Sequence, residues 1–273
     1  MKHKKKKKKE QLSEASQSRV GLSSRLTILS RQSGEAATPQ ARLFSVRLCV
    51  LEAEEIFTVP ECYRDLTIKN LKSRLELLVG IPVNFMRLHY LDEVDLNEDS
   101  TFRSNDIIPG ATLILRIWSE DAWGHLVSAA AMGMKEMLAG VGGISTSEFT
   151  TANAKLMGPE KRAEWLAYRT FVALFITVRR GHMEAVEFLL EHGVDLTLKT
   201  PLGRTVLHVA VTSGNIACID LLIIYGAKVT EEDHEGCTPL DLARLWGQKE
   251  CERRLFQYQW KSRTVKTLKP KLD

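Results

Sequence analysis

A 33-residue period in the second half of the chain constrains its fold more than any other feature. Gly181, Gly214 and Gly247 are spaced by this period. Five further pairs keep the same step: Gly193 and Gly226, Gly203 and Gly236, Thr205 and Thr238, Leu207 and Leu240, Ala210 and Ala243. A unit of this length cannot bury its apolar face alone, so consecutive units must stack. The period predicts paired short helices with glycines at the turns and caps.

The two clearest units resemble the ankyrin repeat. Residues 202–210 read LGRTVLHVA and residues 235–243 read EGCTPLDLA, so both carry altered forms of the family's Thr-Pro-Leu-His tetrapeptide. The preceding unit has lost the tetrapeptide, but its spacing from Gly181 to Gly193 fits the family. The resemblance implies an all-α ankyrin-repeat solenoid over residues 121–258.

The predicted solenoid is irregular at its start. Its parts are a degenerate first unit, an insert at about 140–161, and repeats at about 170–202, 203–235 and 236–258. The insert opens with the glycine-rich stretch 140–143, which lacks the preceding strand and the lysine of a phosphate-binding loop. We therefore expect a flexible loop there.

Residues 43–118 follow a different pattern. Alternating apolar residues from Phe44 to Val50 predict a half-buried strand. From Thr67 the apolar spacing changes to three and four, which predicts an amphipathic helix that ends at Gly80. Further strands are expected near residues 56–59, 87–91 and 113–117, so the segment predicts a small α+β domain with one helix on a sheet.

Ordered fragments of this domain resemble ubiquitin. They are Thr67-Ile68-x-x-Leu71-Lys72, Gly80-Ile81-Pro82, Arg87-Leu88-x-Tyr90, Asp99-Ser100-Thr101-Phe102 and Pro109-Gly110-x-Thr112-Leu113. The resemblance implies a ubiquitin-like β-grasp domain. The last strand is not followed by a free Gly-Gly terminus, so conjugation as a modifier is excluded there. His89 and Arg116 stand where ubiquitin has apolar recognition residues, so ordinary ubiquitin receptors should bind poorly.

Charge is concentrated at the two ends of the chain. The net charge is +4, yet residues 1–42 hold eleven basic and three acidic residues, and the tail at 260–273 holds five basic residues and one acidic residue. We predict a disordered basic arm at 1–42 and a basic tail. The lysine run from Lys4 to Lys9 is read as a solvated tail or an import signal. Nonspecific contact with nucleic acid or acidic lipid is the alternative.

Several function classes are excluded by what the sequence lacks. No stretch approaches the ~20 apolar residues of a membrane helix, so no membrane span is predicted. No GxSxG, HExxH or phosphate-loop motif occurs, so we predict no enzyme, no small-molecule substrate and no cofactor. His208 is expected to bond to Thr205 and nearby backbone rather than to a metal.

The number and spacing of the cysteines indicate the cellular compartment of the protein. They are odd in number and widely spaced, which argues against disulfides and against a metal site. They are Cys49, Cys62, Cys218, Cys237 and Cys251. Reduced thiols favour the cytoplasm or the nucleus.

Partner binding is predicted on the repeat array, because packing uses up the scaffold residues and leaves the hairpin tips and the concave helix face. The predicted binding residues are Lys199, Thr200, Leu202 and Arg204 on a first finger, Asp233, His234, Glu235 and Cys237 on a second, and Val211, Thr212 and Arg244 on the helices. The first finger is basic and the second acidic, which predicts a partner segment of complementary charge.

These features predict a non-enzymatic protein-interaction scaffold or adaptor. The alternative is a ubiquitin-pathway adaptor that docks on proteasome or ligase machinery through its ubiquitin-like domain. Because the array is close to the minimum length for an independent solenoid, we expect the two modules to pack together through Trp118 and Trp123.

Overall fold

The structure is a computed structural model that describes residues 42–267, with side chains described as far as Trp260. The predicted basic arm at 1–42 therefore lies outside the described residues, apart from Arg42. The last six residues of the predicted tail lie outside them as well.

A mixed four-stranded sheet forms the first module. Its strands are β1 (Phe44–Val50), β2 (Glu55–Cys62), β3 (Met86–His89) and β4 (Thr112–Ile117), in the order β2-β1-β4-β3. β1 is parallel to β4, and the other two pairings are antiparallel. The alternation predicted for β1 is confirmed, because every second residue from Val46 to Val50 is buried under the helix.

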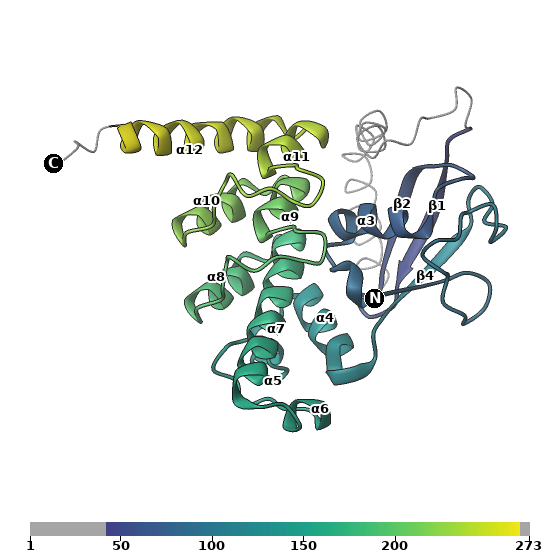
Figure 1. The fold of residues 1–273 in the computed structure, drawn as a ribbon, viewed down its shortest axis with the longest axis horizontal. Coiled ribbons are helices and arrows are strands. Elements are labelled where there is room, and N and C mark those ends of the chain that lie inside the picture. The colour runs from purple at the N-terminus through teal and green to yellow at the C-terminus, as the bar shows by residue number, and fades with distance from the viewer. Residues whose placement is uncertain (1–41, 268–273) are drawn as a thin grey trace, which may run out of the picture.

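Helix α3 (Ile68–Val79) covers one face of this sheet (Figure 1). Its start and end agree with the sequence prediction. The Thr67 hydroxyl accepts a hydrogen bond from the Asn70 amide, and Gly80 ends the helix in the left-handed region at a φ of 68°. The amphipathic stripe accounts for only part of its burial, because Glu76 and Leu77, which lie outside the stripe, are buried as well.

Helix pairs stack beside α3 to form the second module (Figure 1). The helices are α4 (Trp123–Met132), α5 (Lys135–Gly140), α6 (Ala152–Lys155), α7 (Pro159–Arg180), α8 (Met183–Glu191), α9 (Val206–Ser213), α10 (Ile216–Ile224), α11 (Pro239–Leu245) and α12 (Lys249–Thr267). Single 3₁₀ turns, η3 (Val83–Phe85) and η4 (Glu120–Ala122), complete the described elements. The two clearest sequence units correspond to the pairs α9–α10 and α11–α12. Each pair opens with a threonine capping box, at Thr205 and Thr238.

The predicted flexible insert is the main departure from the sequence analysis. α7 begins at Pro159, within the segment assigned to the insert, and Gly142 and Gly143 are buried. Arg169 of α7 packs against this segment. Its guanidinium lies 4.6, 4.7 and 4.8 Å from the ring centroids of Trp123, Phe149 and Trp165. The same group donates to the carbonyl oxygens of Asp121 and Val141 at 2.7 and 2.6 Å. The expectation of a flexible loop was therefore wrong.

The two modules share one continuous hydrophobic core. The predicted role of Trp123 is confirmed, because its ring lies 4.3 Å from that of Phe85 in the first module and is buried. The predicted role of Trp118 is wrong. This side chain is 41% exposed, and the guanidinium of Arg87 lies over its ring.

Candidate functional site

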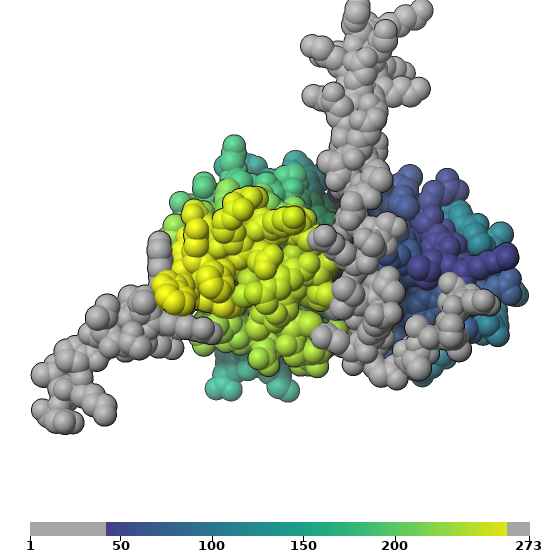
Figure 2. All heavy atoms as spheres, turned by 90° about the horizontal axis from the view of Figure 1, so that it is seen from above, coloured from purple at the N-terminus to yellow at the C-terminus, as the bar shows by residue number. Residues whose placement is uncertain are grey.

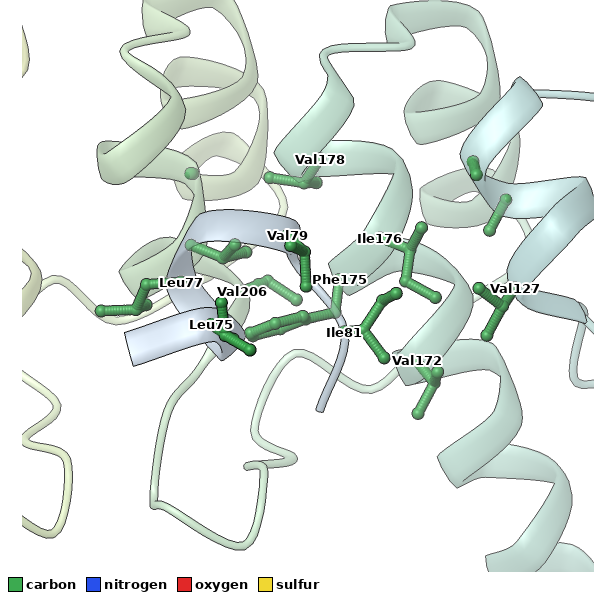
Figure 3. Packing of buried hydrophobic residues seen from close by; sticks show 14 of the residues in the cluster. Leu75, Leu77, Val79, Ile81, Val127, Val172, Phe175, Ile176, Val178 and Val206 are labelled. Atoms are coloured by element: carbon green, nitrogen blue, oxygen red, sulfur yellow. The ribbon is translucent and has the colours of Figure 1, made fainter. Parts of the chain in front are cut away.

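The face of the array that bears the hairpin fingers is occupied by α3 of the same chain. Leu75 and Val79 of α3 lie beside Phe175 of α7 (Figure 3). Leu77 of α3 and Val206 of α9 belong to the same buried cluster. All five side chains are almost fully buried. Water is therefore excluded between the modules, and burial of apolar surface holds them together.

Side chains from the array satisfy the C-terminal carbonyl groups of α3. Arg179 Nε donates to the Leu77 carbonyl at 2.9 Å, and Arg180 Nη1 donates to the Val79 carbonyl at 2.9 Å. The Thr212 hydroxyl also donates to the Leu77 carbonyl, at 3.2 Å. The last carbonyls of a helix lack partners within the helix and carry partial negative charge, so two guanidinium groups are matched to this end of α3.

A buried polar cluster connects α3 to both fingers. Glu76 is fully buried, and its carboxylate accepts hydrogen bonds from the Thr200 hydroxyl and the Val83 amide, both at 2.8 Å. Arg204 Nη1 lies 3.5 Å from this carboxylate, and Arg204 Nε lies 3.5 Å from the carboxylate of Asp233. One guanidinium thus lies between two buried carboxylates.

The same guanidinium also reaches the backbone of α3. Arg204 Nη1 donates to the Ser73 carbonyl at 2.6 Å. Burial raises the pKa of Glu76, and the nearby Arg204 charge and the two hydrogen bonds oppose this shift only in part. Each member of the cluster therefore depends on the others for compensation of its buried charge or polarity.

This arrangement corrects the prediction that the finger residues are exposed. Six of the eleven predicted binding residues are buried: Thr200, Arg204, Val211, Thr212, Asp233 and Cys237. Thr200, Arg204 and Thr212 bond to α3, so their partner in this structure is the first module of the same chain.

The charged residues of the fingers form contacts within the protein. Lys199 forms an ion pair with Glu231 at 2.8 Å, and the Leu202 carbonyl accepts from the His234 amide at 2.9 Å. Both Lys199 and Leu202 are half-buried. The exposed residues of the predicted set are His234, Glu235 and Arg244, and Arg244 is paired with Glu252. Both basic side chains of the first finger, Lys199 and Arg204, therefore have acidic partners within the protein.

Cys237 was predicted at an exposed tip, but it is buried beneath the second finger. Its backbone amide donates to the Asp233 carboxylate at 2.9 Å. Burial raises the pKa of its thiol to about 11, so the thiolate needed for reactivity is scarce at neutral pH. We therefore expect this thiol to be inert.

His208 has the structural role that the sequence predicted. Its Nδ1 accepts from the Thr205 amide at 3.0 Å, and its Nε2 lies 3.0 Å from the Cys237 carbonyl. Burial lowers the pKa of His208 from 6.5 to about 4, because the charged imidazolium would lose its hydration. The ring therefore stays neutral and joins two consecutive repeats.

This shift predicts pH-dependent stability. The unfolded chain takes up a proton on His208 below about pH 6.5, whereas the folded protein excludes it until about pH 4. The contribution of His208 to stability is complete above pH 6.5, and it falls by roughly 3 kcal/mol as the pH drops to 4. Urea unfolding of the wild type and of His208→Gln across this range should give curves that converge as the pH falls. Parallel curves would contradict the assignment.

Three charged residues of the interface were missed by the sequence analysis: Glu76, Arg179 and Arg180. Glu76 could have been found from the sequence, because it stands within a run of leucines. A charged residue among apolar ones needs a partner when it is buried. The two arginines end α7, where basic residues are ordinary, so nothing in the sequence marks them as contacts to another module.

Within the described part of the chain, no group of three or more His, Cys, Asp or Glu side chains is placed to hold a metal ion. None of the described helices is both long enough and apolar enough to cross a membrane.

Two protein-family models match parts of this architecture. A model of ankyrin repeats in three copies matches residues 174–264, and a model of the ubiquitin-like domain matches residues 60–106. The comparison with curated proteins gives no match. The chain thus carries an N-terminal ubiquitin-like domain followed by ankyrin repeats, as the sequence resemblance implied.

Proposed function

We propose that this ankyrin-repeat chain is a non-enzymatic adaptor that holds its ubiquitin-like domain in one fixed orientation and binds a partner through the outer face of that domain's sheet. The observation that carries the proposal is the docking of α3. Because α3 fills the finger-bearing face of the array, the opposite face of the sheet points away from the array (Figure 1). Ankyrin repeats and ubiquitin-like domains are both protein-interaction modules, which supports the adaptor role.

The outer face of the sheet has an apolar row beside a basic side chain. Strand pairing aligns Ile56, Cys49 and Ile114 across β2, β1 and β4. Ile56 is 70% exposed. Arg47 is exposed on the next row, where it pairs in register with Thr58. Such a face suits a partner segment with apolar and acidic side chains.

The positions that resemble ubiquitin's recognition residues are polar and paired. His89 is buried with its Nε2 2.9 Å from Asp95 Oδ1, and Arg116 lies 3.1 Å from Glu93 Oε1. A receptor that buries apolar side chains at these positions would have to break both pairs. These contacts favour a partner specific to this sheet over general ubiquitin receptors.

Substitution on the sheet tests the proposal. Partners should be identified by proximity labelling with the full chain in cells, and binding should then be measured with purified components. We expect Arg47→Glu combined with Ile56→Asp to weaken binding by roughly 1–3 kcal/mol, because it removes an apolar contact and reverses a charge. His234→Ala combined with Glu235→Lys, on the exposed tip of the second finger, is the matched control and should bind normally.

The outcome also separates the two functions considered. Loss of binding in the finger variant alone would contradict the proposal. Proteasome or ligase subunits among partners that depend on the sheet would favour the ubiquitin-pathway alternative.

We place the adaptor in the cytoplasm or the nucleus, since its cysteines form no disulfide in the described part of the chain. Localisation of the tagged chain tests this.

A further inference from the structure

Three methionine residues are exposed at the turn between α4 and α5. Met132 ends α4, Met134 directly precedes α5, and Met137 is the third residue of α5. They are 48%, 42% and 39% exposed. The turn lies at the end of the array opposite α12, which is yellow and faces the viewer in Figure 2 (Figures 1 and 2). Methionine is ordinarily among the more buried residues, so three exposed thioethers within one turn indicate a role at the surface.

The backbone of this turn brings the three side chains within reach of one another. Gly133, between Met132 and Met134, ends α4 in the left-handed region at a φ of 68°. The Met134 amide donates to the Ala129 carbonyl at 3.0 Å, which folds the chain back over the end of α4. Met134 and Met137 occupy the cap position and the third position of α5, where side chains approach each other as in a capping box. Because a methionine side chain has three rotatable bonds, the sulfur atoms can converge on one point.

A histidine that precedes α8 packs against the same turn. A Cβ atom placed on Gly133 would lie 2.7 Å from Cγ of His182, so the imidazole ring covers the residue between Met132 and Met134. His182 Nε2 donates to the Ala131 carbonyl at 2.7 Å. Because a carbonyl oxygen only accepts, Nε2 carries the proton and Nδ1 of the neutral ring keeps its lone pair. Nδ1 has no hydrogen-bond partner among the described residues. A histidine that binds a metal through one nitrogen ordinarily donates from the other in this way.

We propose that this turn binds a copper(I) ion through four uncharged ligands: the thioether sulfurs of Met132, Met134 and Met137, and Nδ1 of His182. Thioether sulfur is a soft ligand that selects copper(I) over the harder divalent cations, and imidazole nitrogen also suits copper. Because the ligands are uncharged, the bound ion keeps its positive charge. The exposed carboxylate of Glu136, between Met134 and Met137 in the sequence, has no ion pair among the described residues, so it favours a cation at this turn.

Silver(I) tests the ligands directly, because it shares the preference of copper(I) for soft ligands and is not oxidised in air. The full chain, with isotope-labelled methionine methyl groups, should be titrated with silver(I) and followed by NMR. We expect the methyl signals of Met132, Met134 and Met137 to shift together, and the imidazole signals of His182 to shift with them. The methyl signal of Met86, which is buried in the first module, should stay in place.

The affinity for copper(I) gives the quantitative test, in competition with bicinchoninate under anaerobic conditions. Met134→Leu combined with Met137→Leu should weaken binding by about tenfold or more, because leucine keeps the size of the side chain but lacks the sulfur. The matched controls are Met157→Leu, at a half-buried methionine outside the turn, and Cys49→Ser, at a half-buried thiol. Both should bind within about twofold of the wild type. Circular dichroism checks that every variant is folded.

Three results would overturn the proposal. The first is unchanged copper(I) affinity in the leucine variant, or a loss of binding in Cys49→Ser. The second is tighter binding of zinc(II) than of copper(I). The third is failure of silver(I) to shift the three methyl signals, including the case in which an apolar peptide shifts them instead and so assigns the turn to a protein partner.

Discussion

Replacing Arg204 with alanine should lower the free energy of unfolding by about 3–5 kcal/mol. The guanidinium lies between the buried carboxylates of Glu76 and Asp233 and donates to the Ser73 carbonyl. Its removal leaves both carboxylates buried without their cation, and such uncompensated charges are among the most destabilising changes in a protein. Urea unfolding monitored by tryptophan fluorescence measures the effect.

A second arginine provides the control for this prediction. Arg253 is exposed and paired with Glu250, so Arg253→Ala should change stability by no more than about 0.5 kcal/mol. Glu76→Gln and its combination with Arg204→Ala complete a double-mutant cycle, in which we expect a coupling of roughly 1–3 kcal/mol between the two positions. Equal effects of Arg204→Ala and Arg253→Ala would show that the cluster does not stabilise the docked modules.

The second large effect is expected at Arg169. Alanine at this position leaves the Asp121 and Val141 carbonyls without their donor and empties the space between three aromatic rings. An unsatisfied buried acceptor costs about 1–3 kcal/mol, and a cavity adds to it, so we expect a total loss of roughly 3–5 kcal/mol. The loop between α5 and α6 should also lose its order.

Hydrogen exchange and limited proteolysis measure the local effect of Arg169→Ala. Amides of residues 141–151 should exchange faster, and cleavage at Lys155 should accelerate. Arg162→Ala on the same helix is the control, because Arg162 is exposed. Similar digestion of the two variants would contradict the assigned role.

The contacts of Arg169 also explain why the prediction of a flexible loop failed. The glycines at 140–143 and the lack of a repeat period predicted an interruption in the array. They carried no information about order, because the rings that hold Arg169 come from α4, the loop and α7. Residues so far apart in sequence reveal a shared site only after folding.

By itself, the sequence determined which elements form. Every second residue of a strand lies on the same face, and a helix turns once every 3.6 residues. The spacing of apolar residues was therefore enough to find β1, α3 and the helix pairs α9–α10 and α11–α12. The repeat glycines and the threonines at 205 and 238 fixed turns and helix starts for the same local reason.

The tertiary structure alone decided what the repeat face binds. Thr200, Arg204 and Thr212 have the types and positions of partner-binding residues, but they bond to α3, more than a hundred residues earlier in the chain. The choice between an internal and an external partner depends on how closely two surfaces fit and on whether buried charges such as Glu76 find compensation. Both depend on the distances between atoms of separate modules, and a linear pattern of residues does not contain those distances.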